Sequence, residues 1–392
     1  MTPSKVAALM IRLRRVTGPS RASAKGATAG IDRPQPGTGG RAIISARYAE
    51  PAPVRSNRAA GSMAVRSAPV DAALPGLSDR AGAAVPARRA WDGPRSVPPP
   101  GPHGGDGARV AEALGVDPGS ILDLSQNLNP FAPDVAAVAR QHLDALRRYP
   151  DPSAATRLLA DAIGVRPERL VLTNGGAAAV AAVAAEIGGR VRSEPEFGLH
   201  PRGADGPVWR SDPHNPSGVL AAAGETADVW DEAFYPLATG RWSAGRDGVV
   251  VGSLTKVFAC PGLRLGYVIA DDVERFARHV PEWAVGSLGV AVLAELLESA
   301  DLPRWAREVA SARAALADVF ARRGWDVVAA DAPWVLVRAP GLRERLAPEG
   351  IVVRDCASFG MPGHVRVAVP DSRGLDRLAR ALDRLSNGDS GS

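Results

Sequence analysis

The pattern of hydrophobic and polar positions changes near Gly101. Before this residue, no helical or strand-like repeat of apolar residues continues over a useful length. After it, apolar residues recur at helical spacing over 134–147 and 153–163, and the short apolar runs at 169–173 and 249–254 are typical of buried strands. The pattern therefore predicts an ordered region that begins at about Gly101.

The same alternation continues to the end of the chain. Further strands are expected at 265–270 and 334–339, helices at 177–187, 290–299 and 303–323, and a strand–strand–helix unit that ends at 372–386. Strands that alternate with helices predict an α/β fold with a mostly parallel sheet. The sequence contains no internal repeat.

The first hundred residues differ in composition from the rest. They hold 16 Lys+Arg against 5 Asp+Glu, whereas the remainder holds 31 against 37. They are rich in Ala, Arg, Pro, Gly and Ser and end in SVPPPGP. We expect residues 1–100 to be a disordered basic tail and linker. Two alternatives stay open: a start codon assigned too far upstream, with Met63 as a later start, or a basic arm that contacts anionic partners.

Charge and cysteine usage exclude several classes of protein. The sequence pI of about 9.7 reflects the tail alone, so a nucleic-acid partner is not expected. Cys260 and Cys356 cannot form a disulfide framework, which favours a reducing cytoplasm. No apolar run approaches the roughly 20 residues of a membrane span, and the N-terminus does not resemble a signal peptide. We therefore expect a cytoplasmic protein without a membrane partner.

Lysine is almost absent from the chain. Lys5 and Lys25 lie in the tail, and Lys256 is the only lysine in 101–392, a region with 30 arginines. Arginine stays protonated, whereas a desolvated lysine can become a neutral nucleophile. The pattern predicts a chemical role for Lys256. The alternative is the chance survival of one surface lysine.

The residues around Lys256 support that role. The segment 253–267 reads SLTKVFACPGLRLGY, and Ser253, Thr255 and Arg264 would suit a phosphate dianion beside an aldehyde. This segment resembles the cofactor-bonding region of fold-type I pyridoxal-phosphate (PLP) enzymes, in the branch of histidinol-phosphate aminotransferase and threonine-phosphate decarboxylase. There the pattern is S-x-[ST]-K followed by PGLRLGY. The resemblance covers roughly 101–388.

The resemblance implies a fold and an assembly. It implies a large PLP-binding α/β domain with a mixed, mostly parallel sheet over 101–285, including an N-terminal arm. A smaller C-terminal α/β domain would occupy 286–388, followed by a short tail at 389–392. The protein would be a homodimer with shared active sites.

The resemblance also implies the cofactor-binding residues. Lys256 would form the Schiff base with PLP and act as general acid and base, and Asp231 in DEAF would keep the pyridine nitrogen protonated. The remaining cofactor contacts would come from the TNGGAAAV turn, the PEFGLH and HNPSG segments, RYPDP of the neighbouring subunit, DEAFY and the lysine segment. In these segments the residues are Gly175, Gly176, Ala177, Phe197, His200, Asn215, Tyr149, Tyr235, Ser253, Thr255 and Arg264.

Each of these residues has an implied place around the cofactor. The glycine turn with Ser253 and Arg264 would hold the phosphate, Phe197 would stack on the ring, and Asn215 would bind the phenolic oxygen. His200 would support Asp231 from behind. Ordinary structural roles stay open for Phe197 and His200, as a core aromatic and a surface histidine. No metal site is expected.

On the substrate side, HGGD (103–106), LSQNLNPF (124–131) and VRDCASFGMPGHVRVAV (353–369) resemble the threonine-phosphate decarboxylase branch. The implied substrate-binding residues are His103, Asn129, Arg354 and Arg366. The two arginines would bind a phosphate and a carboxylate, because guanidinium groups suit both anions. A solvated strand-end charge stays open for one of them.

The chain departs from the family at two points. Phe234 stands where many relatives have a tyrosine, and whether the adjacent Tyr235 replaces it is open. The segments 198–214 and 219–230 are short for the family, which puts the shape of the substrate pocket in doubt.

The interpretation is a PLP-dependent decarboxylase of L-threonine O-3-phosphate, or a similar phosphorylated amino acid, in cobalamin biosynthesis. The first alternative is an aminotransferase acting on a substrate such as histidinol phosphate. The second is a non-catalytic binding protein with a trimmed PLP fold.

Overall fold

The computed structural model describes residues 96–244 and 246–388. Residues 1–95 of the tail expected over 1–100, with Met63 among them, and the short tail at 389–392 lie outside these residues. Residues 96–100 belong to the fold, because Val97 packs against Val110, and Arg343 Nη2 donates a hydrogen bond to the Pro98 carbonyl at 2.9 Å. The ordered region therefore begins before Gly101.

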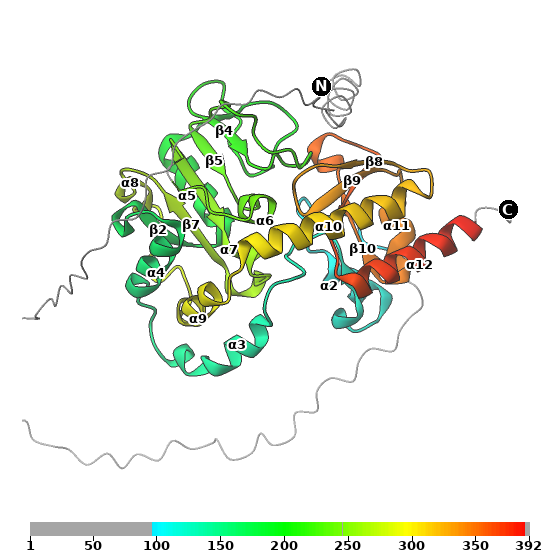
Figure 1. The fold of residues 1–392 in the computed structure, drawn as a ribbon, viewed down its shortest axis with the longest axis horizontal. Coiled ribbons are helices and arrows are strands. Elements are labelled where there is room, and N and C mark those ends of the chain that lie inside the picture. The colour runs from blue at the N-terminus through cyan, green and yellow to red at the C-terminus, as the bar shows by residue number, and fades with distance from the viewer. Residues whose placement is uncertain (1–95, 245, 389–392) are drawn as a thin grey trace, which may run out of the picture. The chain divides into compact units, whose positions relative to one another are not determined.

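The largest sheet has six strands in the order β2-β7-β6-β5-β4-β3 (Figure 1). Its strands are β2 (Leu170–Asn174), β3 (Arg190–Val191), β4 (Val208–Ser211), β5 (Val229–Asp231), β6 (Val249–Ser253) and β7 (Leu265–Ile269). Neighbouring strands from β3 to β6 run parallel, while β7 is antiparallel to both β6 and β2. This confirms the predicted α/β fold with a mixed, mostly parallel sheet.

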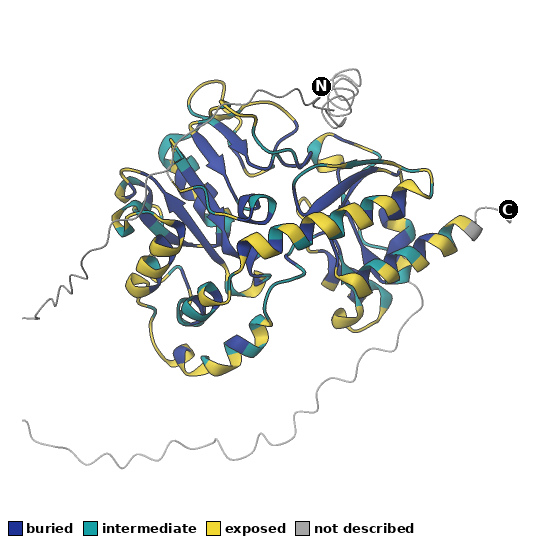
Figure 2. Cartoon of the chain, viewed as in Figure 1, coloured by how far each residue is buried: buried dark blue, intermediate teal, exposed yellow. Residues whose placement is uncertain are grey.

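Helices cover both faces of this sheet, and Figure 2 shows its strands buried between them. On one face, α5 (Gly175–Ile187) and α8 (Glu274–Ala277) pack against β4 to β7. On the other face lie α3 (Val135–Gln141), α4 (Ser153–Ile163) and α9 (Ser287–Glu298). Successive strand residues point to opposite faces, so Val250 and Val251 enter different cores.

The second sheet is antiparallel, with the order β11-β12-β9-β8. Its strands are β8 (Asp326–Ala329), β9 (Trp334–Arg338), β11 (Arg354–Asp355) and β12 (His364–Ala368). The helices of this part are α10 (Leu302–Ala321), α11 (Leu342–Leu346) and α12 (Ser372–Gly388). α10 packs against β8 and β9 and also against α6 (Tyr235–Thr239), which follows β5. The predicted domain boundary after residue 285 stays a prediction.

A pair of very short strands joins the N-terminal segment to this second part. β1 (Leu122–Asp123) runs parallel to β10 (Ile351–Val352), and α2 (Gly107–Leu114) precedes it. The polar segment after β1 then reaches the first sheet, where the Asn129 N–H donates to the Lys256 carbonyl at 3.1 Å. The Ala368 N–H in β12 donates to the Leu124 carbonyl at 2.9 Å, so the N-terminal segment contacts both larger sheets. Across the described residues, no helix is both long and apolar enough to cross a membrane.

Most of the predicted elements are confirmed within a few residues. The helix expected at 153–163 is α4, and the strands expected at 249–254 and 265–270 are β6 and β7. The elements that the periodicity analysis missed include α2, β4, β5 and β8. These elements are short or interrupted by charged residues, so they carry too few apolar positions for a period to be recognised.

Candidate active site

A cavity of about 460 Å³ lies at the carboxyl ends of β5 and β6 and is closed on its other side by β11 and β12. Ligands of α/β sheets bind at this edge, because the loops that follow the strands converge there. Twelve of the residues expected from the sequence line the cavity: His103, Gly176, Ala177, Phe197, Asn215, Asp231, Ser253, Thr255, Lys256, Arg264, Arg354 and Arg366.

One end of the cavity is built to hold an anion. α5 begins at Gly175, and the Asn174 side chain does not cap it, so the first N–H groups of the helix are available to a ligand. Arg264 lies so close to Gly175 that a side chain there would overlap the guanidinium group. Thr255 Oγ1 is buried and has no hydrogen-bond partner among the described residues. Together with Ser253, these groups form a site suited to a phosphate.

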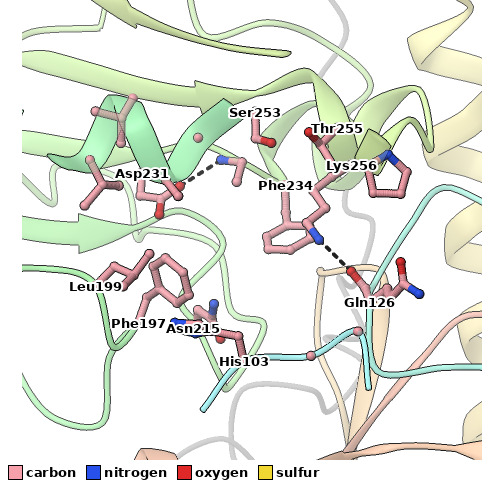
Figure 3. Close-up of a pocket in the computed structure, with 18 of the residues that line it drawn as sticks. His103, Gln126, Phe197, Leu199, Asn215, Asp231, Phe234, Ser253, Thr255 and Lys256 are labelled. Atoms are coloured by element: carbon pink, nitrogen blue, oxygen red, sulfur yellow. Dashed lines mark hydrogen bonds between the residues drawn. The ribbon is translucent and has the colours of Figure 1, made fainter. Parts of the chain in front are cut away.

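Lys256 lies one short turn beyond β6, in α7 (Leu254–Val257). Its Nζ donates a hydrogen bond to the Gln126 carbonyl at 2.7 Å (Figure 3). Burial, followed by the positive charges of Arg366 and Arg264, lowers the pKa of Lys256 to about 8, against a smaller raising effect of Asp123. A lysine with this pKa exists partly as the neutral amine near pH 8, so it can act as a nucleophile or a base.

Asp231 occupies the last position of β5 and has its carboxylate fixed by two donors. Oδ1 accepts from the Ala233 N–H at 3.0 Å, and Oδ2 lies 3.0 Å from His200 Nε2. His200 is fully buried behind Asp231, and its other nitrogen, Nδ1, lies 3.9 Å from the buried Glu196 carboxylate. The arrangement holds a carboxylate at the cavity wall, where it can pair with a cationic ring nitrogen.

Phe197 and Asn215 form the wall next to Asp231 (Figure 3). The Phe197 ring meets His200 edge-on, with 5.5 Å between ring centroids, and lies 6.0 Å from the His103 ring. Asn215 Oδ1 accepts a hydrogen bond from Arg366 Nη1 at 2.6 Å. That contact leaves the Asn215 amide nitrogen free to donate to a ligand oxygen.

Arg354 and Arg366 lie directly opposite each other on the antiparallel strands β11 and β12. Directly paired residues project from the same face of a sheet, so both guanidinium groups reach the cavity. Both are buried, and burial together with the charge of Arg354 lowers the pKa of Arg366 to about 10, against a raising effect of Cys356. With its amide oxygen facing Arg366, Asn127 accepts from Nη2 at 3.0 Å and from Nε at 3.1 Å.

Arg354 is engaged with the N-terminal segment. Its Nη1 donates to the Gly101 carbonyl at 2.7 Å, and its Nη2 donates to the Pro102 carbonyl at 2.5 Å and to Ser358 Oγ at 2.7 Å. Burial lowers the pKa of Arg354 as well. The arginine therefore fixes the segment that brings His103 to the cavity.

The structure places five of the expected residues outside the cavity lining. Gly175 and His200 lie directly behind it, in contact with Arg264 and Asp231. Asn129 is buried, and its Nδ2 donates to the Val257 carbonyl at 2.9 Å, so its side chain supports the lysine helix and does not face a substrate.

The two tyrosines are also away from the cavity. The Tyr235 ring lies against Arg246, 4.9 Å from its guanidinium carbon, so it does not take the place of the tyrosine that Phe234 replaces. Phe234 itself lines the cavity. Tyr149 is 79% exposed and stacks on Trp283 at the surface, with 4.7 Å between ring centroids.

Sequence reasoning missed several residues of the cavity wall. Ser125, Gln126, Leu199 and Phe359 line it, although none carries a pattern of its own. Ser125 and Gln126 stand inside LSQNLNPF, one of the segments that resemble the threonine-phosphate decarboxylase branch, and this resemblance was the available signal. The functional atom of Gln126 is a backbone carbonyl, which no residue type specifies.

Comparisons with known proteins agree with this geometry. The family model described as "Aminotransferase class I and II" matches residues 208–382. A histidinol-phosphate aminotransferase of Halorubrum lacusprofundi is 29% identical over 357 residues, covering 71% of this chain and 93% of the relative. A threonine-phosphate decarboxylase of Salmonella typhimurium is 28% identical, covering 73% of this chain and 97% of the relative.

Solved structures show the same fold. The L-threonine-O-3-phosphate decarboxylase of Porphyromonas gingivalis superposes with a TM-score of 0.60 at 20% identity, covering 68% of this chain and 100% of that one. The histidinol-phosphate aminotransferase of Sinorhizobium meliloti, solved in complex with pyridoxal-5'-phosphate, gives 0.62 at 19% identity, covering 75% and 96%.

Proposed function

We propose that this chain, a PLP-dependent enzyme whose residues 208–382 match the class I and II aminotransferase model, acts on a small phosphorylated amino acid. The reaction we propose is decarboxylation of L-threonine O-3-phosphate, as part of cobalamin biosynthesis. The observation that carries the substrate class is the pair of buried arginines, Arg354 and Arg366, facing the cavity that contains Lys256. The relatives carry enzyme names, so the non-catalytic alternative is not proposed.

The residues present fit the cofactor. The unpartnered Thr255 hydroxyl, the uncapped start of α5 at Gly175 and the Arg264 guanidinium group match a phosphate monoester. Asp231 would pair with the pyridine nitrogen, and the Asn215 amide would donate to the phenolic oxygen. PLP, when bound through Lys256, supplies an electron sink for the bond that breaks at the substrate's α-carbon.

The protein's own residues then decide the reaction. His200 and the Ala233 N–H hold the Asp231 carboxylate in one orientation, nearly withdrawn from solvent, where it would face the ring nitrogen of a bound cofactor. Phe197 would limit movement of a bound ring on one side. The Lys256 amine would be the general acid that returns a proton to the substrate's α-carbon.

Two anions on one substrate need two separate cations. L-threonine O-3-phosphate carries a phosphate and a carboxylate, and we propose Arg354 for the phosphate and Arg366 for the carboxylate. His103 lines the cavity next to these groups, and burial followed by the Arg354 charge lowers its pKa, so its imidazole can act as a neutral hydrogen-bond donor.

An aminotransferase is equally supported by the relatives, several of which are named histidinol-phosphate aminotransferases. The same two arginines would serve the phosphate of histidinol phosphate in one half-reaction and the second carboxylate of an amino-acid donor in the other. Lys256 would then act as the base that removes the proton from the substrate's α-carbon.

We also propose a homodimer in the cytoplasm. Apolar side chains are exposed where Tyr149 stacks on Trp283, beside a hollow of about 390 Å³ lined by Pro150 and Pro152. Exposed apolar patches of this kind mark protein interfaces. An exposed Tyr149 suits a residue that reaches the cofactor of a second copy. The two cysteines are free and buried, which supports a reducing compartment.

Two experiments test the proposal. Borohydride reduction of the PLP-loaded protein should fix the cofactor to the peptide that contains Lys256, whereas labelling only at Lys5 or Lys25 would overturn the assignment of the lysine. Incubation with O-phosphothreonine should release carbon dioxide. Incubation with histidinol phosphate and 2-oxoglutarate should form glutamate only if the protein is an aminotransferase. No product in either reaction would contradict the proposed substrate class.

A further inference from the structure

Asp123, at the end of β1, accepts four hydrogen bonds from two segments of the chain. Its Oδ1 accepts from the Ser125 N–H at 2.9 Å and from Ser125 Oγ at 2.5 Å. Its Oδ2 accepts from Gln126 Nε2 at 2.8 Å and from the Gly107 N–H at 3.0 Å. A carboxylate with both oxygens doubly occupied is held in one orientation, and it holds its donors in turn.

These donors lead directly to the lysine. Gln126, whose side chain is bound by Asp123, presents the backbone carbonyl that accepts from Lys256 Nζ at 2.7 Å. Ser125 Oγ in addition accepts from the Gly105 N–H at 2.7 Å, and both Gly105 and Gln126 line the cavity. One carboxylate therefore fixes two loops of the cavity wall and the acceptor of the lysine amine.

The charges around Lys256 give Asp123 a second effect. Besides Lys256, the cavity wall has five ionisable groups: His103, Asp231, Arg264, Arg354 and Arg366. Three of them are arginines. Burial, Arg366 and Arg264 lower the pKa of Lys256, and Asp123 is the group that raises it. Asp123 thus opposes the two arginines.

We propose that Asp123 is a positioning residue for Lys256, and that it fixes, through Gln126, the place where the lysine amine rests whenever it is not bonded to the cofactor. The inference rests on the proposed role of Lys256 and adds a residue to it. Asp123 acts through Gln126 and does not touch the substrate. A carbonyl oxygen accepts a hydrogen bond from the protonated and from the neutral amine. The Lys256 amine therefore stays at the Gln126 carbonyl while it gains or loses a proton.

The test measures the Lys256 amine itself, in the full chain without cofactor. Trace acetylation with acetic anhydride across a pH series, followed by mass spectrometry of the peptide that contains Lys256, gives the midpoint of its protonation. Lys5 and Lys25 in the same chain serve as references for the reagent. In D123N the midpoint should move to lower pH by about half a unit or more, because the neutral amide no longer offsets the two arginines.

Q126A provides a second variant that keeps the Asp123 charge and the backbone carbonyl. It should shift the midpoint in the same direction by less, because the carbonyl is then less firmly fixed. D117N is the matched control: Asp117 is an exposed carboxylate that accepts from the Gly119 N–H at 2.7 Å, and its loss should leave the midpoint unchanged.

Unchanged or raised midpoints in D123N and Q126A, with circular dichroism showing both folded, would overturn the inference, even if both proteins melt at lower temperature. If D123N does not fold, Q126A decides alone. Borohydride labelling of wild-type protein keeps the two proposals apart. Labelling at Lys256 with unshifted midpoints removes the role of Asp123 only, and absence of that labelling removes the proposed role of Lys256.

Discussion

Replacing Arg354 and Arg366 separately by methionine should distinguish the anion that each binds. Methionine keeps much of the apolar stem and removes the charge. Both arginines are buried, so a substrate anion that loses its partner is left desolvated and unpaired, at a cost of about 2–5 kcal/mol. At about 1.4 kcal/mol per tenfold, kcat/KM should fall roughly 30- to 4000-fold.

The two losses should differ in kind. With O-phosphothreonine and threonine compared at saturating PLP, R354M should penalise the phosphorylated substrate far more, whereas R366M should penalise both. R366M should also weaken PLP binding, because Arg366 Nη1 holds Asn215 at 2.6 Å. R354M should leave PLP binding intact, since its donors go to Gly101, Pro102 and Ser358. Equal losses on both substrates in both variants would refute the phospho-amino-acid assignment and the decarboxylase with it.

Three further predictions concern the protein without substrate. Burial raises the pKa of Glu232 from its ordinary 4.5 to about 7. The free energy of unfolding should therefore be higher at low pH and fall as the pH rises through 7, by on the order of 2 kcal/mol. Thermal melts from pH 5 to 8 should show this loss, and E232Q should reduce it. W283E should shift the protein from dimer to monomer in size-exclusion chromatography, while V116E, at another exposed apolar position, should not. A chain that begins at Ser96 should melt at the same temperature as the full chain, whereas one that begins at Asp106 should melt lower, because Arg343 and Arg354 lose their carbonyl acceptors.

That the residues proposed to bind the cofactor lie around one cavity could be predicted from the sequence, because they stand in long motifs. Lys256, Ser253, Thr255 and Arg264 belong to one continuous segment. Asp231 ends β5 and Asn215 follows β4, and the ends of these strands meet at one edge. Chain order together with sheet topology is enough to bring them together.

The substrate half depends on long-range pairing that no local pattern encodes. That Asn129 supports the lysine helix follows from a contact 128 residues away. That Tyr235 turns to Arg246 follows from the packing behind β5. Tertiary contacts decide the direction in which each of these side chains points. The presence of the residue in a motif was therefore not enough to predict that its side chain faces the cavity.

The direct pairing of Arg354 with Arg366 determines how the chain can tolerate insertions. Side chains alternate between the faces of a strand, so one extra residue in β11 or β12 that shifts their register would turn an arginine away from the cavity. The turn between these strands can lengthen only if the pairing is kept. Length changes should therefore accumulate in the segments 198–207 and 219–228, which lie outside the paired strands, and be rare in the strands that carry the two arginines.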